Sequence, residues 1–567
     1  MRFWHLYAAG LALTGLARTA RGQEAVPMVR FATFNVALNR PHAGDLARDL
    51  RAGSAQAHAV AEIVQRARPD VLLLNEFDWD AEGAALAVFR ADYLGKAHGD
   101  AQPISFEHAF VAAVNTGEPS GLDLDRDGKT DGAGDAFGYG AFPGQYGMVV
   151  LSRLPIARTR VRTFRSLLWK DMPDAWWPDD PHTDEPADWY GAPARDAMRL
   201  SSKSHWDIPI EVGSTCVHLL ASHPTPPVFD GPEDRNGKRN HDEIRLWADY
   251  VDAERSAWIR DDAGQRGGLA AGEHFVVAGD LNADPSDGDG PPAIDQLLEH
   301  ARIDASLMPR SAGGIEAAKR QGGANTRQRG DPGLDTGDFA DSSVGNLHLD
   351  YVLPSRGLQP WCGGVFWPRA EEPLFALVGD GDPVVSSDHR LVWLDVSLPR
   401  AAALVGQPFD QLGGGQPGGA RFLEPFAFAD HELTLVRWWT EGCPFCAATL
   451  PALEELRQRF ATRGLAVVGM YHPKPIREVD DNQVRAFATE RGFGGPVAAD
   501  ARWQKLADLR ARGAPEAATS ISILVNRAGT IVWVHPGPRL HPSTDPAHGA
   551  AARAHAELLH LLSTTLR

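Results

Sequence analysis

The stretch FVVAGDLNADP, residues 275–285, is a short apolar run that ends in two polar side chains. Its small and β-branched residues predict a buried strand, and Pro285 prevents the run from continuing as a central strand. Asp280 and Asn282 are two residues apart, so they face the same side of an extended chain. Such a pair can hold a water, a metal ion or a phosphate. Taken alone, such a pair is more often part of an Asx-rich turn, so other polar residues in the chain are needed to distinguish a functional site from a turn.

Other apolar segments of the first 400 residues also end in polar side chains or carry one. Residues 29–36 alternate as a half-buried strand does and contain Asn35. Residues 71–76 form a continuous apolar run, typical of a strand covered on both faces, that ends in Glu76. Further strand-like segments supply His223, Asp350, Asp388 and His389. Each residue alone is more often a cap or turn residue, but the set indicates a shared site.

The chemistry that needs such a set is hydrolysis of a phosphate ester. Carboxylate oxygens bind a hard cation such as Mg²⁺, which polarises the phosphoryl group and offsets its charge. A carboxylate can also orient or deprotonate the attacking water. Imidazoles paired with carboxylates can donate hydrogen bonds to the phosphoryl oxygens or the leaving group.

The length of the chain and its N-terminal residues indicate how many domains it has and whether it is exported. A chain of 567 residues favours two domains over one, and 43% hydrophobic residues are typical of globular protein. Arg2, the apolar residues 3–16 and the small residues before Gln23 are typical of a signal peptide over 1–22. We therefore expect export to the periplasm or the exterior; the alternative is a short buried helix. No run is long enough to span a membrane, so we expect no stable membrane insertion.

The net charge of −18 is concentrated in the first part of the chain. Residues 1–400 hold 58 acidic and 39 basic residues, whereas residues 401–567 hold 16 and 17. An acidic surface disfavours sequence-independent binding to nucleic-acid phosphates. It is compatible with a divalent cation that carries positive charge into the site.

The order and context of these motifs resemble the deoxyribonuclease-I-like endonuclease/exonuclease/phosphatase superfamily. The resemblance spans residues 28–398. It rests on FATFNVA (31–37), PDVLLLNEFD (69–78), QYGMVVLS (145–152), the histidine at 223, GDLNADP (279–285), LDYVLP (349–354) and SSDHRLV (386–392). It implies a four-layer αββα sandwich, with two mostly antiparallel sheets and helices outside, over residues 28–400.

The resemblance also implies roles for the residues of the set. Glu76 would be the main ligand of Mg²⁺ or Mn²⁺, with Asn35 supporting metal and phosphate and Asp388 as a second metal-side carboxylate. Asp280 would orient the nucleophilic water, with Asn282 beside it on the phosphate. His389, with Asp350 as its partner, would contact phosphate oxygens, and His223 would lie near the leaving group.

Family likeness does not fix the substrate, because relatives cut DNA or RNA, hydrolyse inositol phosphates or cleave sphingomyelin. The polar loop at 229–243 resembles a substrate-side insertion, in which Arg239 and Asn240 could grip a phosphate. The alternative is a solvated helix entry capped by Asn240 or Asp242. Lys203 is either a phosphate contact or a surface residue.

An Asp-rich loop forms a second candidate ion site. Asp123, Asp125, Asp127 and Asp131 alternate around Gly128 as in the first half of a calcium loop. The twelfth position is Gly134 rather than glutamate, so the loop is no EF-hand. Ca²⁺ binding and an ion-free acidic turn are both compatible with this pattern.

The Gly-rich segment 401–420 indicates a boundary before a second domain at 421–567. In that domain Cys443-Pro-Phe-Cys446 lies between a predicted strand and a predicted helix. A helix N-terminus favours the thiolate, so Cys443 would be the nucleophile and Cys446 the resolving thiol towards a redox partner protein. The context resembles a smaller thioredoxin-like α/β domain over 403–567. Gly442 and Thr519-Ser520 depart from its usual pattern, in which a tryptophan and a cis-proline stand there.

The sequence leaves the state of two cysteines and the choice of function open. Cys216 and Cys362 are either a structural disulfide, which export favours, or buried thiols. The leading interpretation is an exported metal-dependent phosphoesterase, and the first alternative is a secreted DNA or RNA nuclease. Interpretations of a different class are a thiol-disulfide oxidoreductase with a non-catalytic binding module, and a calcium-binding adhesion protein.

Overall fold

The computed structural model describes residues 28–212, 215–289, 293–381, 383–398, 404–409, 420–441, 443–514, 520–535, 539–542 and 549–566. The expected signal peptide lies outside these residues, as does most of the Gly-rich segment 401–420. Among the helices described, none is long and apolar enough to cross a membrane.

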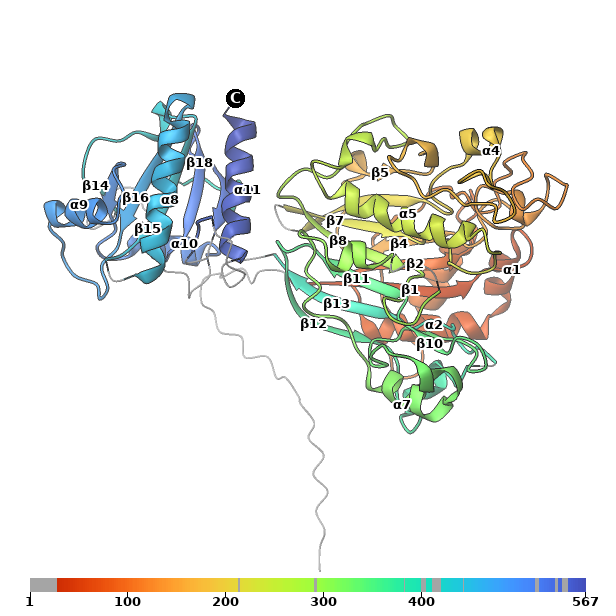
Figure 1. Ribbon diagram of the computed structural model, residues 1–567. Helices are drawn as coiled ribbons and strands as arrows, with labels where there is room; N and C mark the ends of the chain where they lie inside the picture. The colour runs from red at the N-terminus through yellow and green to blue at the C-terminus, as the bar shows by residue number, and fades with distance from the viewer. Residues whose placement is uncertain are drawn as a thin grey trace, which may run out of the picture.

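Two sheets form the centre of the first domain (Figure 1). The first has the order β12 (Gln359–Val365), β13 (Val392–Ser397), β1 (Met28–Leu38), β2 (Val71–Phe77), β4 (Met148–Ser152), β3 (His108–Phe110). The second has the order β11 (Asp350–Pro354), β8 (His274–Asp280), β7 (Thr215–Ser222), β6 (His205–Val212), β5 (Arg162–Thr163). Each sheet is antiparallel except for one parallel pair, β1 with β2 and β7 with β8. A small ribbon pairs β9 (Gly337–Asp338) with β10 (Asn346–Leu347).

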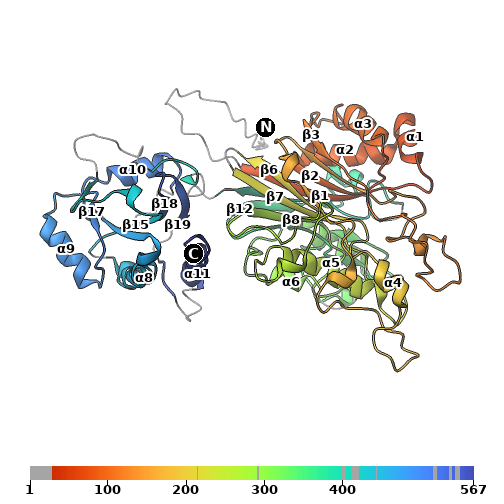
Figure 2. The same cartoon turned by 90° about the horizontal axis from the view of Figure 1, so that it is seen from above.

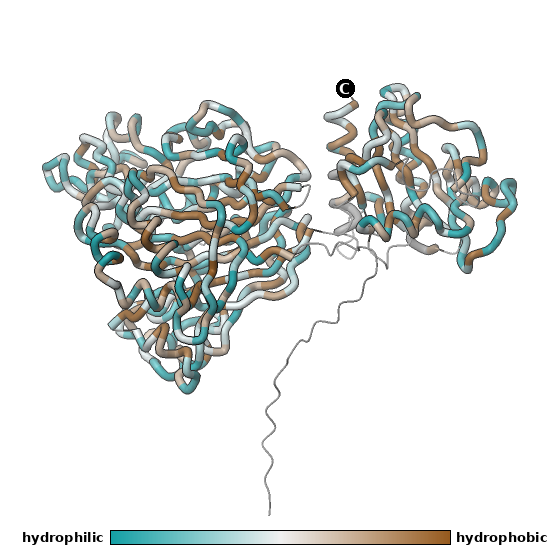
Figure 3. Tube along the Cα trace, turned by 180° about the vertical axis from the view of Figure 1, so that it is seen from behind, coloured by the Kyte–Doolittle hydropathy of each residue, from teal (hydrophilic) through white to brown (hydrophobic). Residues whose placement is uncertain are grey.

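Alternation along the strands places the two sheets face to face. In β8, Val276 and Ala278 join the core that the two sheets share, whereas Phe275 and Val277 pack on the outer side. Because side chains alternate across a strand, one apolar run can serve two cores. The apolar segments coloured brown in Figure 3 run through these strands.

Helices cover the outer face of each sheet, as Figure 2 shows. One side carries α1 (Asp45–Ala52), α2 (Ala55–Ala67) and α3 (Ala84–Val88), and the other carries α4 (Ala192–Ala197), α5 (Arg235–Tyr250) and α6 (Asp295–Leu298). A further helix, α7 (Ala312–Gln321), follows in the chain. The expected αββα sandwich is therefore confirmed.

One helix begins earlier than its sequence suggests. The sequence predicts a polar loop over 229–243, or a helix entry capped at Asn240 or Asp242, but α5 already begins at Arg235. The Asp230 carboxylate accepts from the amide nitrogen of Asn236 at 2.6 Å and so holds the first turn. Residues 235–241 are thus helical, and this changes where their side chains lie.

The second domain is a sheet between helices. Its order is β14 (Arg421–Phe422), β17 (Val497–Ala499), β16 (Leu465–Tyr471), β15 (Leu433–Trp439), β18 (Ser522–Asn526), β19 (Ile531–His535). Its helices are α8 (Pro444–Phe460), α9 (Asp481–Glu490), α10 (Gln504–Ala511) and α11 (Gly549–Thr565). Residues of α8, α9 and α11 join the apolar core on one face of the sheet, and residues of α10 join the core on the other. This arrangement confirms the expected thioredoxin-like fold.

Candidate active site

Strand pairing brings the polar strand ends of the first domain together. Asp280 at the end of β8 lies opposite Asp350 at the start of β11. Parallel pairing of β1 with β2 sets Asn35 opposite Asn75, beside Glu76. Gly279 lets β8 lie close to the end of β7, because a Cβ atom at Gly279 would lie 2.0 Å from the carbonyl oxygen of Ser222 on β7. We call Asn35, Glu76, His223, Asp280, Asp350 and His389 the Asp280 cluster.

Asn35 joins the two acidic residues that flank it. Its Nδ2 atom donates to Asp280 Oδ2 at 2.9 Å and to Glu76 Oε1 at 3.1 Å. The other carboxylate oxygen of Glu76 accepts from Asn39 Nδ2 at 2.8 Å. Glu76 itself has a φ of 57°, a left-handed conformation that turns its side chain out of the regular strand pattern.

A histidine–carboxylate pair faces Asp280 from the other side. His389 Nδ1 lies 2.8 Å from Asp350 Oδ2, and His389 Nε2 lies 3.7 Å from Asp280 Oδ2. Thr336 fixes the pair, because its hydroxyl donates to the same Asp350 oxygen at 2.8 Å. Nδ1–H of His389 is therefore committed to Asp350, which directs Nε2 towards Asp280.

His223 and Lys203 complete the surroundings of Asp280. His223 Nε2 lies 3.4 Å from Asp280 Oδ2, and the buried Nδ1 atom of His223 has no hydrogen-bond partner. Lys203 is 7% exposed, and its Nζ donates to the Pro224 carbonyl at 3.4 Å. The charge of Lys203 acts on the titration of both Glu76 and His223, so this lysine belongs beside the cluster rather than on the surface.

Burial and neighbouring charges shift the pKa values of the cluster. Burial raises the pKa of Glu76, and Asp388 raises it further. Burial also raises the pKa of Asp280, and the Asp350 charge adds to that rise. Burial lowers the pKa of His389, but the Asp350 and Asp280 carboxylates outweigh it and raise the pKa well above its ordinary value. Burial, Lys203 and His389 lower the pKa of His223 well below its ordinary value.

Opposite shifts on the two imidazoles give them different protonation states at neutral pH. His389 is the proton-carrying imidazole, held between two carboxylates. His223 is the neutral one. The arrangement can therefore present one proton donor and one raised-pKa carboxylate, Asp280, to a reacting group.

The oxygen atoms of the cluster fit a divalent cation. Glu76 offers a carboxylate, Asn35 is hydrogen-bonded to it, and the charge of Asp388 acts on it. Burial disfavours the charged form of Glu76 and so raises its pKa; a bound cation would offset this unfavourable free energy. Asp280, Asp350 and His389 also offer one ligand atom each within 4.8 Å of one another, and Asp350 Oδ1 is buried without a hydrogen-bond partner. Oxygen-rich donor sets of this kind suit Mg²⁺ or Mn²⁺.

Two other predicted site residues, Asn282 and Asp388, lie in segments beside the Asp280 cluster. The backbone nitrogen of Asn282 donates to Asp280 Oδ1 at 3.0 Å, and its side-chain nitrogen donates to the Pro224 carbonyl at 3.1 Å. Asn282 thus ties the segment after β8 to the segment after β7. Asp388 is partly buried and accepts from Ser387 Oγ at 3.4 Å.

The structure does not turn Arg239 and Asn240 towards the cluster. Arg239 donates to the carbonyl oxygens of Leu200, Phe137 and Arg199. Asn240 Nδ2 donates to the carbonyls of Thr225 and Leu281, at 2.8 and 3.0 Å. Both side chains hold loops around the site together, so we leave them out of the substrate contacts proposed below.

In the second domain, the two cysteines lie at the start of α8. Cys443 is the residue before the helix, Pro444 is its first residue, and Cys446 is fully buried in the first turn. The Ser520 hydroxyl lies 4.0 Å from Cys443 Sγ and 3.9 Å from Cys446 Sγ. Thr519, where the family pattern has its cis-proline, and Gly442 lie outside the described residues.

Comparisons with known proteins find family matches in both parts of the chain. Residues 32–389 match the model of the Endonuclease/Exonuclease/phosphatase family. The chain belongs to that family. Residues 423–550 match the Redoxin model. Among curated proteins there is no match.

Several solved structures are similar to parts of the chain. An endonuclease/exonuclease/phosphatase from Beutenbergia cavernae is 19% identical over 65% of this chain and 72% of its own, with a TM-score of 0.35. Sphingomyelinase C from Streptomyces griseocarneus is 18% identical over 65% and 99%, with a TM-score of 0.33. A protein described as a thiol:disulfide interchange protein DsbE, from Chlorobium tepidum, is 18% identical over 24% and 82%, with a TM-score of 0.19.

Four residues of the endonuclease/exonuclease/phosphatase domain support the cluster without having been predicted: Asn39, Asn75, Thr336 and Ser387. Asn75 Oδ1 accepts from the backbone nitrogen of Asp280 at 3.2 Å, and Ser387 Oγ donates to the Asn35 carbonyl at 2.7 Å. Asn75 and Ser387 lie next to predicted residues, inside quoted motifs, which is the signal that could have found them. Thr336 comes from a loop with no such signal.

The Asp-rich loop of the family domain groups a different set of acids from the one predicted. Asp123 and Asp125 come within 4.8 Å of buried Asp135, whereas Asp127 and Asp131 are outside this group. Both oxygens of Asp135 accept backbone N–H groups, from Leu124 at 2.8 Å and Gly132 at 2.9 Å. Asp135 therefore fixes the loop, and Ca²⁺ binding there stays a prediction.

Neither alternative given for Cys216 and Cys362 fits the structure. Both are free thiols, and neither is buried, since Cys216 is half-buried and Cys362 is exposed. Cys216 lies on β7 of one sheet and Cys362 on β12, at the edge of the other. Cys216 Sγ instead accepts from Arg160 Nη1 at 3.3 Å.

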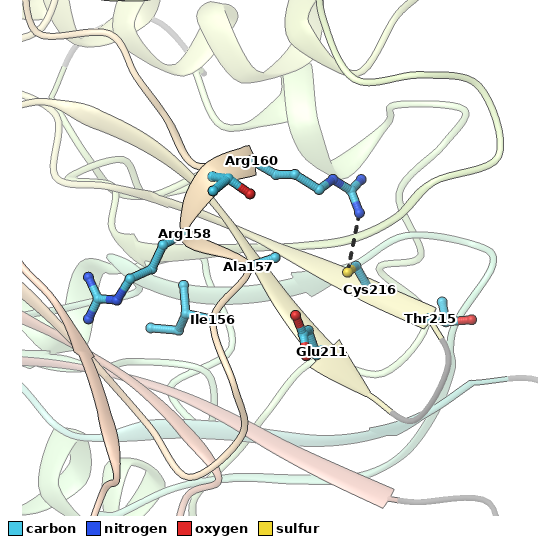
Figure 4. Close-up of a pocket in the computed structure, with 8 residues that line it drawn as sticks. Ile156, Ala157, Arg158, Arg160, Glu211, Thr215 and Cys216 are labelled. Atoms are coloured by element: carbon cyan, nitrogen blue, oxygen red, sulfur yellow. Dashed lines mark hydrogen bonds between the residues drawn. The ribbon is translucent and has the colours of Figure 1, made fainter.

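The hollow in Figure 4 lies at the opposite end of β6 and β7 from the Asp280 cluster. It has a volume of about 540 Å³ and is lined by Ile156, Ala157, Arg158, Thr159, Arg160, Glu211, Thr215 and Cys216. The dashed line in Figure 4 is the contact between Arg160 and Cys216. The lining of the hollow includes no residue of the Asp280 cluster, so this hollow is separate from the candidate active site.

Proposed function

We propose that residues 28–398 form an exported phosphoesterase that depends on Mg²⁺ or Mn²⁺ and hydrolyses a phosphomonoester or phosphodiester. The observation that carries the proposal is the continuous set of contacts from Glu76 through Asn35 to Asp280, and from Asp280 to the His389–Asp350 pair. The proposal for the second domain is a dithiol/disulfide centre at Cys443 and Cys446.

In this proposal Asp280 prepares the attacking water. Its raised pKa makes the carboxylate a better proton acceptor than an exposed aspartate. Asn35 holds one oxygen of Asp280 and the backbone of Asn282 holds the other, so the carboxylate keeps one orientation. Lys203, beside the cluster, would contact a phosphate oxygen.

The two histidines take different parts. His389 carries the proton that its raised pKa retains, and would donate it as a hydrogen bond to a phosphoryl oxygen. His223, whose buried Nδ1 atom has no partner, would lie towards the leaving group. A divalent cation held by Glu76, Asn35 and Asp388 would polarise the phosphoryl group and offset its negative charge.

The acidic first domain supports a small phosphate ester over nucleic acid. Residues 1–400 carry 58 acidic against 39 basic residues, and this negative net charge disfavours binding to the phosphate backbone of a nucleic acid. Nucleic acid stays the second candidate substrate, since a bound cation would offset part of this repulsion. Export rests on the N-terminal signal pattern, and protein recovered outside the cytoplasm should begin at Gln23.

A metal-supplemented phosphoester panel tests the proposal. Purified full-length protein is incubated with Mg²⁺ or Mn²⁺ and with plasmid DNA, RNA, inositol phosphates, sphingomyelin and a chromogenic phosphodiester. We expect turnover of at least one ester, its loss on chelation and its return on addition of Mn²⁺. Nicking of plasmid by the wild type but not by Glu76→Ala would favour the nuclease. Turnover that persists in chelator would defeat the metal proposal.

The redox proposal is tested by titrating the thiols of the reduced protein. A helix N-terminus favours the Cys443 thiolate, so we expect it to form well below the pKa of free cysteine, about 8.5. Cys443→Ser should remove this titration and Cys446→Ser should retain it. A Cys443 thiol that ionises only at the free-cysteine value would sink the redox proposal.

A further inference from the structure

A buried arginine lies in the sheet beneath the two cysteines of the second domain. In β15, Leu433, Leu435 and Trp439 alternate on the face that packs with Cys446 and α8. Arg437 occupies the remaining position of that row and is fully buried. The pattern predicts an apolar residue at this place, and a guanidinium there loses its favourable hydration.

The neighbours of Arg437 include both sulfur atoms. Its side chain is hydrogen-bonded to Cys446, and the charges of Cys446 and Cys443 both act on it. Its Nη1 atom donates to Ser522 Oγ at 3.0 Å. Ser522 lies directly opposite Arg437 on β18, and His535 lies opposite Ser522 on β19. The guanidinium is thus held from the sheet side and directed to the start of α8.

The charge on Arg437 persists inside the core. Burial lowers its pKa, yet a guanidinium stays protonated in proteins. In contrast, the hydrogen bond with Cys443 and burial raise the pKa of Cys446, and Arg437 opposes that rise. A positive charge beside a sulfur atom favours its thiolate over its neutral or disulfide form.

We propose that the guanidinium of Arg437 stabilises the thiolate of Cys446 as it leaves the Cys443–Cys446 disulfide and thereby speeds the attack of dithiol partners on that disulfide. The inference rests on the redox centre proposed above and adds a positioning residue to it. No neighbouring sequence motif singles out this role, because Arg437 is one strand residue in an apolar run.

The exchange that Arg437 would assist is balanced in electrons and protons. A thiolate of the partner attacks Cys443 Sγ, the Cys443–Cys446 bond breaks, and Cys446 leaves as the thiolate beside Arg437. The second partner thiol loses its proton and attacks the partner's own sulfur, which expels Cys443. The partner becomes a disulfide and two electrons pass to the protein. Of the two protons that the partner gives up, one ends on Cys446 after it has left, and the other goes to Cys443 or to solvent. A stabilised leaving thiolate favours the first step.

The experiment measures the rate constant for reduction of the oxidised full-length protein by dithiothreitol, read by mass-tagging the free thiols at timed intervals. Arg437→Met should lower this rate constant by about tenfold or more, because the departing Cys446 thiolate loses the adjacent positive charge. Arg459→Met is the control, since Arg459 is exposed near the far end of α8, and it should leave the rate constant unchanged. An unchanged rate constant in Arg437→Met overturns the inference.

Two further variants keep the test decisive if Arg437→Met does not fold. Arg437→Gln removes the charge but keeps a hydrogen-bonding amide, whereas Arg437→Lys keeps the charge. We expect the rate constant of the lysine variant to lie closer to wild type than that of the glutamine variant. Equal rate constants in these two variants would show that charge is not the cause and would overturn the inference. A wild type that exchanges no disulfide would instead refute the redox proposal itself.

Discussion

At the scale of single residues, Asp280 contacts residues of the candidate site that come from three different parts of the chain. It contacts Asn35 from the first sheet, His223 from the neighbouring strand end and His389 from the segment before β13. These partners lie as far as 245 positions away in sequence. The carboxylate is 1% exposed, so its position is fixed by protein atoms rather than by bulk water.

Thr336 offers a test of how the His389–Asp350 pair is held. Its hydroxyl donates to Asp350 and accepts from the backbone nitrogens of Leu349 and Asp350, each at 3.0 Å. Thr336→Val keeps the shape and removes these bonds, so we expect the free energy of unfolding to fall by about 1–3 kcal/mol. Turnover should fall as well, because Asp350 loses its anchor. Urea unfolding and initial rates measure the two effects.

The matched control is Thr326→Val, since Thr326 is exposed and its hydroxyl donates only to a nearby carbonyl. It should change neither quantity measurably. A Thr336→Val protein with wild-type stability and rate would contradict the anchoring role.

The residue scale also shows where prediction from sequence ends. Residue identity and strand position were enough to predict that Asn35, Glu76, Asp280, Asp350 and His389 lie close together. Thr336 could not be predicted, because a hydroxyl in an irregular loop carries no periodic signal. For Arg239 the sequence left a phosphate contact and a solvated helix entry open, but its buried side chain donates to backbone carbonyls instead. The free Cys216 and Cys362 show that an even cysteine count does not imply a pair.

At the scale of elements, the ends of β1 and β2 form the side of the site where we propose that the cation binds. The register of this pair shifts between Asn35 and Leu38, and Glu76 takes a left-handed backbone conformation. Periodicity predicted both strands, but a bulge and a positive φ are set by tertiary contacts. Together they bring the Glu76 carboxylate within reach of Asn35 and Asn39.

Metal binding at these strand ends predicts a thermal shift without any substrate. Mn²⁺ at about 100 times its dissociation constant should stabilise the folded domain by about 2.7 kcal/mol. Glu76→Gln should lose most of this stabilisation, which calorimetry with and without Mn²⁺ would measure. Asp125→Asn, in the Asp-rich loop, should keep the Mn²⁺ effect and lose any separate effect of Ca²⁺. A full Mn²⁺ shift in Glu76→Gln would place the cation elsewhere.

The packing of β6 on α5 predicts a pH dependence of stability. His205 is 1% exposed; its Nε2 donates to the Glu243 carbonyl at 2.9 Å and its Nδ1 lies 2.7 Å from Ser201 Oγ. Burial lowers the pKa of His205 to about 4, against an ordinary value of 6.5. The unfolded chain therefore binds a proton first as the pH falls, and stability is lost between pH 6.5 and pH 4.

The share of His205 in this loss is roughly 3 kcal/mol, from the size of the pKa shift. Urea unfolding of the first domain at a series of pH values would measure it. His205→Gln should flatten the pH dependence, and His182→Gln, in an exposed loop, should leave it unchanged. An equally steep dependence in His205→Gln would mean that other groups cause the loss.

At the scale of the whole molecule, the chain combines two α/β units with separate apolar cores. Strand residues of the first unit supply two clusters around its two sheets, and residues from 404 onwards supply the other two. Alternation and apolar runs predicted strands in both units, and the resemblance of the quoted motifs to known families predicted the two folds. The boundary predicted at 401–420 stays a prediction, because residues 410–419 lie outside those the structure describes. Substrate choice was beyond sequence reasoning, because it depends on loop side chains rather than on strand ends.

The most direct test of the central claim is kcat/KM for the best ester of the panel, with saturating Mn²⁺, in wild type and Asp280→Asn. Asparagine keeps the size of the side chain but cannot take the proton of the water, so kcat/KM should fall by about 10²–10⁴-fold. Asp92→Asn, whose side chain is exposed and pairs only with the exposed Lys96, should match wild type. An Asp280→Asn protein that retains wild-type kcat/KM would contradict the account.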